Sequence, residues 1–361
     1  MLNIRFKEDL LIMGNQAADL DSSVSAFAFA SLLKKVYPER SIYPLIQGSP
    51  SDMRLKPEIE SLFLKAEISL KPENFTSVFF NPDSLLINSD SLEKAAVIMV
   101  DHNRADTEEI THPIRGIVDH HIDSGLSMDL KLRDIRICGS CASIISEYWQ
   151  QSAEKIPYGI TLLLAGAIAV DTGYLDPSWG KTTELDRRQY EALSKTLMPE
   201  DRYFIDELLN IKNDLSHLSM DEQLRRDYKD FPMENLKGGI SSVPLGQKNF
   251  FSSAFYKDET VMDFSRRNCP DFLIIMHTVP EPFKRELSLY TENSSNELSG
   301  ILKTALNRLK DPGLKIIRPE RRISMSTNKW TFYSQKNIKI SRKVLVPLLK
   351  EELETLINSK T

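Results

Sequence analysis

The 361-residue chain has few cysteines, no long apolar runs and no repeats, and each shortage excludes a class of protein. Its three cysteines are too few for the disulfide framework of a small secreted protein. Because no apolar run reaches the roughly 18 residues that a membrane helix needs, the sequence predicts no membrane partner. The first residues also lack the apolar core and the cleavage site of a secretory signal, so we expect a cytoplasmic protein.

Several catalytic and structural signatures are missing as well. The chain has no Gly-x-x-x-x-Gly-Lys loop and no serine–histidine nucleophile motif, which disfavours P-loop nucleotide hydrolysis and covalent acyl chemistry. Cys138 and Cys141 have no second cysteine pair and no nearby histidine that would complete a zinc site. The absence of repeats or low-complexity tracts argues against a scaffold built from arrays.

The charged residues are distributed unevenly along the chain. With 41% hydrophobic and 27% charged residues the composition is that of an ordinary globular protein, and the length suits two domains. Residues 1–204 contain 21 basic and 30 acidic side chains, whereas residues 205–361 contain 25 and 21. An acidic half that can hold cations and a basic half that can hold an anion suggest a polyanionic substrate bound between them. A solvated basic surface is the alternative that composition leaves open.

Strands and helices alternate in the first half of the sequence. We expect strands at 10–13, 41–46, 77–80, 95–100, 115–118 and 135–138, and helices at 21–37, 52–64, 82–92, 140–151 and 157–170. This alternation predicts a doubly wound α/β domain with a mostly parallel sheet over residues 1–200. With a boundary between Met198 and Asp206, residues 206–361 form a smaller α+β domain, in which we expect helices at 220–231, 294–309 and 343–358 and strands at 239–245 and 272–277.

Side chains that can bind a metal ion follow four apolar segments. Because the carboxyl ends of parallel strands meet at one edge of a sheet, we expect these side chains to lie together. Carboxylate oxygens with one or two imidazoles suit Mg²⁺, Mn²⁺ or Co²⁺, and two such ions can clamp a phosphate and activate a water between them. The four clusters are Asn15 with Asp19 and Asp21, then Asp101, then Asp119-His120-His121, then Asp171.

In this order the clusters resemble the four motifs of the DHH phosphoesterase superfamily. In the second half, 227–231 and Ser341-Arg342-Lys343 resemble the substrate-binding motifs of its DHHA2 subfamily, which contains family II inorganic pyrophosphatases, fungal cytosolic exopolyphosphatases and prune-type proteins. The nuclease and cyclic-dinucleotide branches are typified by a Gly-Gly-Gly-His motif. That motif is missing here, because Gly238-Gly239 is followed by Ile240.

The resemblance implies a role for each motif residue. Asp19 and Asp101, with Asn15 nearby, would hold one ion, and a second ion would be held by Asp21, Asp101, His120 and Asp171. His121 would contact the phosphoryl group under attack, and His102 and Asn103 would support the ligands. Lys229, Ser341, Arg342 and Lys343 would bind the substrate phosphates, while Arg318, Arg321 and Arg322 either extend this anion track or form a solvated surface.

One departure from the pyrophosphatase pattern favours a particular substrate. Pyrophosphatases of this group resemble His-x3-Asp-x-Asp in the first motif, whereas Asn15 occupies the histidine position here. We therefore expect a monomeric exopolyphosphatase that releases terminal orthophosphate from inorganic polyphosphate with two Mg²⁺ or Mn²⁺ ions, Co²⁺ being a further option. The alternatives are a pyrophosphatase, a prune-like short-chain polyphosphate or nucleotide phosphohydrolase, and a non-catalytic interaction protein. An exonuclease lacks its binding motif, and we expect no stable nucleic-acid partner.

Overall fold

We describe the fold from a computed structural model. It describes residues 6–47, 54–68, 79–80, 95–104, 112–233, 236–253, 256–279, 283–292, 297–317 and 329–359. The chain divides into two compact units, residues 1–214 and residues 215–361. No helix in the described ranges is both long and apolar enough to cross a membrane.

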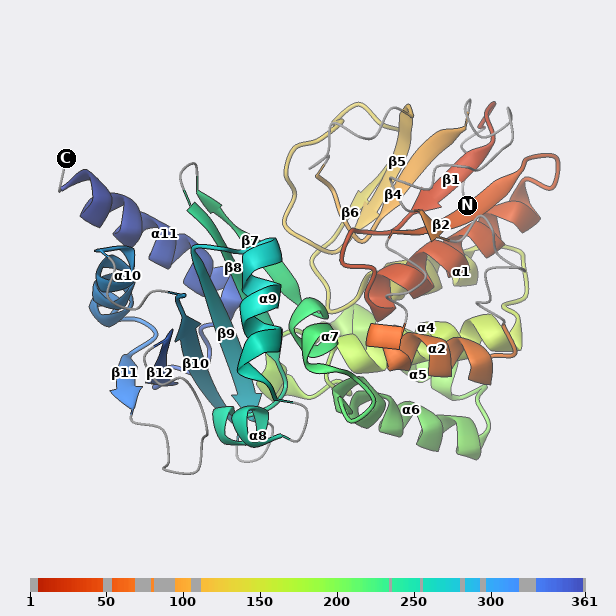
Figure 1. Cartoon of the computed structure of the whole chain (residues 1–361). Helices are drawn as coiled ribbons and strands as arrows, with labels where there is room; N and C mark the ends of the chain where they lie inside the picture. The colour runs from red at the N-terminus through yellow and green to blue at the C-terminus, as the bar shows by residue number, and fades with distance from the viewer. Residues whose placement is uncertain are drawn as a thin grey trace. The chain divides into compact units, whose positions relative to one another are not determined.

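Unit 1 is a parallel sheet with its helices following the strands (Figure 1). Its strands are β1 (Leu10–Met13), β2 (Ile42–Gln47), β3 (Phe79–Phe80), β4 (Ala96–Val100), β5 (Ile114–Asp119) and β6 (Leu132–Ile135). Its helices are α1 (Leu20–Val36), α2 (Pro57–Lys65), α3 (Cys141–Gln151), α4 (Tyr158–Asp171), α5 (Glu184–Ser194) and α6 (Pro199–Asn213), with a short 3-10 helix, η4 (Pro177–Trp179).

The strand order of the first sheet creates a switch point between β1 and β4. The order is β3-β2-β1-β4-β5-β6, and each neighbouring pair is parallel. The chain runs outward from β1 on one side and from β4 on the other, and the carboxyl ends of strands at such a switch point are where open α/β sheets bind ligands. The predicted doubly wound parallel sheet is confirmed, although the last strand lies three residues earlier than the predicted 135–138.

The core of unit 1 is built around α4. Eleven of its fourteen residues are buried, and α1, α2, α3, α5 and α6 all pack against it. The opposite face of the sheet has a smaller apolar cluster that includes Leu11, Met13, Val97 and Ile117. The helix predicted at 82–92 lies outside the described residues. Asp171 is the last residue of α4, so the apolar segment before this ligand is the helix predicted at 157–170, whereas the other three clusters follow strands.

Unit 2 is a mixed sheet with helices, as predicted. Its sheet has the order β11-β12-β10-β9-β8-β7, in which only β8 and β9 are parallel. Its strands are β7 (Tyr228–Met233), β8 (Leu236–Val243), β9 (Phe272–Val279), β10 (Lys284–Tyr290), β11 (Leu314–Ile317) and β12 (Trp330–Gln335). Its helices are α7 (Met220–Arg225), α8 (Gln247–Ser252), α9 (Asp258–Asn268), α10 (Glu297–Arg308) and α11 (Arg342–Asn358).

The prediction of a single helix over 220–231 is wrong. Helix α7 ends at Arg225, and the second half of the segment is β7, which pairs antiparallel with β8. A side chain on Gly239 would collide with the ring of Tyr228, with its Cβ 2.2 Å from the nearest ring atom. The glycine of β8 therefore makes room for an aromatic residue of β7, a cross-strand contact that favours the strand over a longer helix.

The division between the units falls later than the boundary expected between Met198 and Asp206. Helix α6 begins at Pro199 and packs on α2 and α4, and its residues Ile205 and Leu208 are buried in the core of unit 1. The polar composition of α6 hides this packing, because only one face of the helix is apolar.

Candidate metal and phosphoryl site

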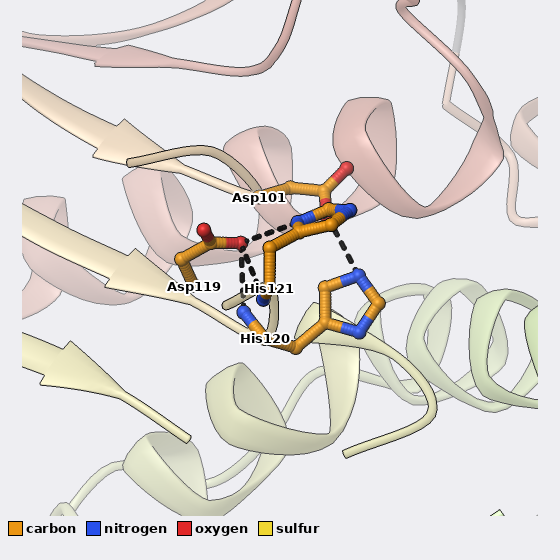
Figure 2. Close-up of side chains that lie close together, drawn as sticks. All are labelled: Asp101, Asp119, His120 and His121. Carbon is orange, nitrogen blue, oxygen red and sulfur yellow. Dashed lines mark hydrogen bonds and ion pairs between the residues drawn. The ribbon is translucent and has the colours of Figure 1, made fainter. Parts of the chain in front are cut away.

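The candidate site lies at the carboxyl ends of β1, β4 and β5. Asn15 lies in the loop after β1, Asp101 follows β4 and Asp119 is the last residue of β5. Figure 2 shows the side chains of Asp101, Asp119, His120 and His121 turned toward one another. The order of the strands therefore brings together three motifs that are spread over residues 15–121 of the sequence.

Asp101 is held in a strained and buried position. Its φ is 62°, in the left-handed region that non-glycine residues rarely adopt, and only 2% of the residue is exposed. Asn15 Nδ2 donates to Asp101 Oδ2 at 2.7 Å, and Asn15 Oδ1 accepts from Ala18 N at 3.1 Å. Asp101 Oδ1 is buried and makes no hydrogen bond to the described residues; His120 Nε2 lies 3.1 Å from it. Such an orphaned carboxylate oxygen is a natural ligand for a cation.

The beginning of α3 holds Asp21. Ser140 Oγ donates to Asp21 Oδ1 at 2.7 Å, Cys141 N donates to Oδ2 at 2.7 Å, and Ala142 N donates to Oδ1 at 2.9 Å. The free amides at a helix N-terminus favour an anion, so α3 holds the carboxylate of α1 in place. Cys138 and Cys141, which lie between β6 and the first turn of α3, are both free and buried.

The same loop also orients His120. His120 Nδ1 lies 2.9 Å from the carbonyl oxygen of Cys138, and this contact fixes Nδ1 as the donor. Nε2 is then directed at the carboxylates, 3.1 Å from Asp101 Oδ1 and 3.7 Å from Asp21 Oδ2. A backbone carbonyl behind an imidazole is the usual support of a metal-binding histidine.

Asp119 orients His121 and is itself held by Asn103. Asp119 is fully buried, and its Oδ1 accepts from His121 Nδ1 at 2.8 Å and from His120 N at 2.7 Å. Asn103 Nδ2 donates to Asp119 Oδ2, and Ser124 N donates to Asn103 Oδ1 at 2.8 Å. Burial alone would raise the pKa of Asp119, but the hydrogen bonds from His121 and Asn103 outweigh it and lower that pKa. The carboxylate thus remains charged and holds the ring of His121.

Asp171 and Asp19 complete the acidic side of the site. One ligand atom each from Asp21, His120 and Asp171 lie within 4.8 Å of one another, as do single ligand atoms from Asp101, Asp119, His120 and His121. Asp19 is the N-cap of α1, and its Oδ1 accepts from Ser22 N at 3.1 Å. Four of the predicted ligands, Asp21, Asp101, His120 and Asp171, therefore lie in two overlapping groups that share His120. Asp19 is in neither group, but its negative charge contributes to the raised pKa values of Asp21 and Asp101.

Several buried carboxylates lie close together in the cluster, and their negative charges repel one another. Burial and the negative charge of Asp21 raise the pKa of Asp101, and burial and the charge of Asp171 raise that of Asp21. Burial would lower the pKa of His120, but the carboxylate of Asp101, 3.1 Å from its Nε2, and the charge of Asp21 outweigh burial and raise that pKa. A divalent cation between these groups would relieve the repulsion that raises the carboxyl pKa values, so the donor set fits a metal site.

Backbone strain is concentrated around the same residues. Six non-glycine residues in the described ranges have positive φ, and four of them lie within four positions of a predicted ligand or are one: Ala18, Asp101, Tyr174 and Leu175. Left-handed backbone at a non-glycine residue costs about 1–3 kcal/mol and persists where the surrounding structure enforces it, often at functional sites.

Unit 2 contains the predicted phosphate-binding residues. Ser341 is the N-cap of α11, and its side chain makes no capping hydrogen bond. Arg342 is mostly buried and pairs with Asp227, with its Nη2 2.6 Å from Asp227 Oδ1. Lys229 is exposed on β7, and Lys343 is the second residue of α11. Arg318, Arg321 and Arg322 lie outside the described residues.

Two supporting features were missed by sequence reasoning. The first is Asp119, which belongs to the third motif but which no sequence pattern identifies as the residue that orients His121. The second is Asp186, which is fully buried on α5; its Oδ2 accepts from Gly139 N at 2.8 Å and its Oδ1 accepts from Ser143 Oγ at 2.6 Å. Asp186 thereby fixes the loop that holds Asp21 and His120. The sequence signal that could have identified Asp186 is a helix-capping pattern, in which Thr183 is followed three residues later by Asp186.

Two family models match this arrangement. Residues 9–170 match the DHH family N-terminal domain, and residues 206–352 match the DHHA2 domain. The two matches follow each other along most of the chain and contain the metal-site motifs and the basic motifs respectively. The chain therefore belongs to the DHH family, in the group that also carries a DHHA2 domain.

The chain is similar in sequence to several named proteins. A Schizosaccharomyces pombe protein named "Putative exopolyphosphatase" is 28% identical, covering 95% of this chain and 90% of that protein. The human protein named "Exopolyphosphatase PRUNE1" is 27% identical, covering 97% of this chain and 76% of its own length. A "Probable manganese-dependent inorganic pyrophosphatase" of Archaeoglobus fulgidus is 27% identical but covers 65% of this chain and 70% of that protein.

The fold agrees with that of a solved structure. The crystal structure titled "Methanococcus jannaschii putative family II inorganic pyrophosphatase" superposes with a TM-score of 0.61 at 19% identity, covering 96% of this chain and 99% of that one. At this identity the likeness establishes the fold alone.

Proposed function

We propose that the protein is a metal-dependent exopolyphosphatase that hydrolyses terminal phosphoanhydride bonds of inorganic polyphosphate and releases orthophosphate. The observation that carries the proposal is the cluster of carboxylates and imidazoles at the β1–β4 switch point, in a chain similar over nearly its whole length to proteins named exopolyphosphatase. The relative named as a pyrophosphatase aligns with a smaller share of the chain.

Five residues are the proposed metal ligands. Asp19, Asp21, Asp101, His120 and Asp171 would hold two divalent cations, Mg²⁺ or Mn²⁺. Such ions, when bound, stabilise negative charge on a phosphoryl group and lower the pKa of a neighbouring water. The orphaned Oδ1 of Asp101 supports its place as a shared ligand.

In the proposed reaction His121 donates a proton to the phosphoryl oxygen or stabilises the negative charge that develops on it. Its Nδ1 is occupied by Asp119, so Nε2 is the ring nitrogen left to face the substrate, and the side chain is 41% exposed. A carboxylate behind the ring stabilises the protonated imidazole, which can then donate to a developing phosphoryl charge. His121 thus acts as acid or as a charge stabiliser, with Asp119 and Asn103 holding its ring.

Asn15 supports Asp101 in this proposal. Both polar atoms of its amide are hydrogen bonded, one to Asp101 and one to Ala18 N. A histidine at this position would offer imidazole, which is a stronger ligand for Mn²⁺ or Co²⁺ than an amide. The asparagine therefore favours a Mg²⁺-tolerant site and an exopolyphosphatase over a pyrophosphatase.

Basic side chains of the DHHA2 domain would bind the phosphates behind the scissile bond. Arg342 presents a planar guanidinium that can hold phosphate oxygens bidentately, and Ser341, Lys229 and Lys343 belong to the same pair of motifs. Arg342 forms an ion pair with Asp227 in the structure. A substrate phosphate would therefore compete with this carboxylate or share the guanidinium with it.

Phosphate release from a panel of substrates tests the proposal. Long-chain polyphosphate, tripolyphosphate, pyrophosphate and a short oligonucleotide are supplied in parallel with Mg²⁺, Mn²⁺ or a chelator. We expect metal-dependent release that is fastest from polyphosphate. A preference for pyrophosphate would favour the pyrophosphatase alternative, and no release from any substrate would favour an interaction protein.

A further inference from the structure

The N-terminal turn of α5 is joined to the beginning of α3 by one buried carboxylate. Asp186, the third residue of α5, is fully buried and accepts four hydrogen bonds. Its Oδ2 accepts from Gly139 N at 2.8 Å and from both the amide and the hydroxyl of Thr183 at 2.7 Å. Its Oδ1 accepts from Ser143 Oγ at 2.6 Å. Because an ionised carboxylate has about four acceptor positions, these bonds use the whole hydrogen-bonding capacity of Asp186.

A single peptide group connects Asp186 to His120. The amide nitrogen of Gly139 and the carbonyl oxygen of Cys138 belong to the same peptide, and this oxygen accepts from His120 Nδ1 at 2.9 Å. The N–H and the C=O of a trans peptide point in opposite directions, so the carboxylate and the imidazole lie on opposite sides of the group. Hydrogen bonds in such a chain polarise one another, so the charge of Asp186 makes the carbonyl a stronger acceptor for His120. A stronger acceptor at Nδ1 makes Nε2, the nitrogen directed at the carboxylates, a better metal ligand.

Asp186 also holds the segment that contacts Asp21. The hydroxyl of Ser140 and the amide of the next residue both donate to the carboxylate of Asp21 at 2.7 Å. In the sequence these two donors lie between Gly139 and Ser143, the two residues of this segment that donate to Asp186. The position of the Asp21 carboxylate therefore depends on a segment that Asp186 holds at both ends.

The third proposed ligand of this group is followed by a residue that packs on the same loop. Asp171 precedes Thr172, and a Cβ added to Gly139 would lie 2.5 Å from Thr172 Cγ2, so the loop lies directly against this threonine. The carbonyl oxygen of Thr172 accepts from Thr182 Oγ1 at 3.4 Å, and Thr182 directly precedes the N-cap of α5. The N-terminal end of α5 thus supports the end of α4 that carries Asp171, as well as the segment that holds the other two ligands.

The proposed ligands of the first ion have other supports. Asp101 Oδ2 accepts from Asn15 Nδ2 at 2.7 Å, and Asp19 Oδ1 accepts from Ser22 N at 3.1 Å. Both donors belong to the segment that runs from β1 into α1, and not to α5 or the loop before α3. A change at Asp186 should therefore affect one of the two ions much more than the other.

We propose that Asp186 is a positioning residue that acts on His120 through the peptide group between them. By holding this peptide and the segment after it, Asp186 sets the affinity for one of the two ions, the ion held by Asp21, His120 and Asp171. The proposal rests on the proposed metal-dependent function and adds to it a residue outside the set of ligands. If Asp186 only joined α3 to α5, its loss would lower the stability of unit 1 and affect both ions alike.

Titration of Mn²⁺ into the full-length, metal-free protein without substrate tests the proposal, with the bound ions counted from the electron paramagnetic resonance signal of free Mn²⁺. Asp186→Ala removes the acceptor oxygens and should weaken the binding of one Mn²⁺ by roughly 10- to 100-fold, the usual effect of losing an outer partner of a metal ligand. The affinity for the other Mn²⁺ should stay as in wild type. The amide of Asp186→Asn can still accept from Gly139 N and can donate to Ser143 Oγ, so the affinity of this variant should lie between those of wild type and Asp186→Ala.

Ser146→Ala is the matched control for loss of packing between the two helices. Ser146 Oγ donates to Gln189 Oε1 at 2.8 Å, a buried hydrogen bond that joins α3 to α5 three residues beyond the contact of Ser143 with Asp186. This variant should lower the free energy of unfolding in urea, as Asp186→Ala does, without changing either Mn²⁺ affinity. Excess Mn²⁺ should restore the kcat of Asp186→Asn, because the loss lies in the binding of an ion and not in the groups that face the substrate.

Each contrary result has a distinct meaning. Wild-type affinities for both ions in Asp186→Asn, the variant that keeps the fold most readily, would overturn the proposal. Equal weakening of both ions by Asp186→Ala, or the same selective loss in Ser146→Ala, would also overturn it, because a packing role would then be sufficient. A wild-type protein that binds no Mn²⁺ would instead overturn the proposed metal-dependent function, on which the proposal rests.

Discussion

Replacing Asp119 with asparagine tests whether this buried carboxylate sets the state of His121. The new amide keeps the volume of the side chain, and its oxygen can still accept from the backbone amides of His120 and His121. It removes the negative charge behind the imidazole and turns one acceptor into a donor that faces the amide nitrogen of Asn103. The Nδ1–H of His121 then donates to a neutral amide oxygen, so the ring loses the charge-assisted hydrogen bond that stabilises its protonated form.

The size of the effect follows from the contact that is lost. A hydrogen bond to a charged group contributes about 1.5–3 kcal/mol, which at 1.36 kcal/mol per decade corresponds to a roughly 10- to 150-fold lower kcat. Because Asp119 faces His121 and Asn103 and is not among the assigned ligands, the affinity for Mn²⁺ should change much less than kcat.

The assay is phosphate release from polyphosphate at saturating metal, together with calorimetric titration of Mn²⁺. Asp123→Asn is the matched control, because Asp123 lies in the same segment but is more exposed and pairs with Arg133. Asp119→Asn with more than half of the wild-type kcat would refute this role of Asp119. Activity that excess metal fully restores would instead make Asp119 a residue of the metal site.

Three further predictions address stability and the first motif. Burial lowers the pKa of His277 to about 4. Because the unfolded chain binds a proton at this histidine below about pH 6.5 and the folded chain does not, the protein should lose roughly 3 kcal/mol of stability as the pH falls toward 4. Urea unfolding at pH 7 and 4.5 should show a smaller loss for His277→Gln than for wild type. Gly139→Ala places a Cβ 2.5 Å from Thr172 Cγ2, and it should cost about 1–3 kcal/mol in the same assay and weaken Mn²⁺ binding. Asn15→His should raise kcat/KM for pyrophosphate relative to polyphosphate and shift the metal preference toward Mn²⁺ or Co²⁺; an unchanged ratio would remove position 15 as a guide to the substrate.

Much of unit 1 follows from its sequence pattern. The strands near 10–13 and 95–100 are uninterrupted apolar runs, the form of a parallel strand buried on both faces. The ligands come directly after such runs, so Asp101 and His120 could be placed at one edge before their geometry was known. Asp171 departs from this pattern, because the apolar run before it is the buried helix α4 and not a strand.

The supports of the site depend on tertiary contacts that no local pattern records. Asp119 and Asp186 owe their roles to partners that only the folded chain brings close, His121 in one case and Gly139 in the other. The strand β7 was missed because its charged sequence suits a helix, and its pairing with the glycines of β8 decides the outcome. The pairing of Arg342 with Asp227 could not be foreseen either, because the two residues are 115 positions apart.

The central claim, that orthophosphate is released from chain ends at the Asp101 centre, is tested most directly by phosphorus NMR of long-chain polyphosphate during turnover. With Mg²⁺ or Mn²⁺ the proposed function predicts that the orthophosphate signal grows while the number of chain-end phosphates stays constant, and that Asp101→Asn abolishes this growth. Fragments of intermediate length as the first products, or orthophosphate released by Asp101→Asn at the wild-type rate, would contradict it.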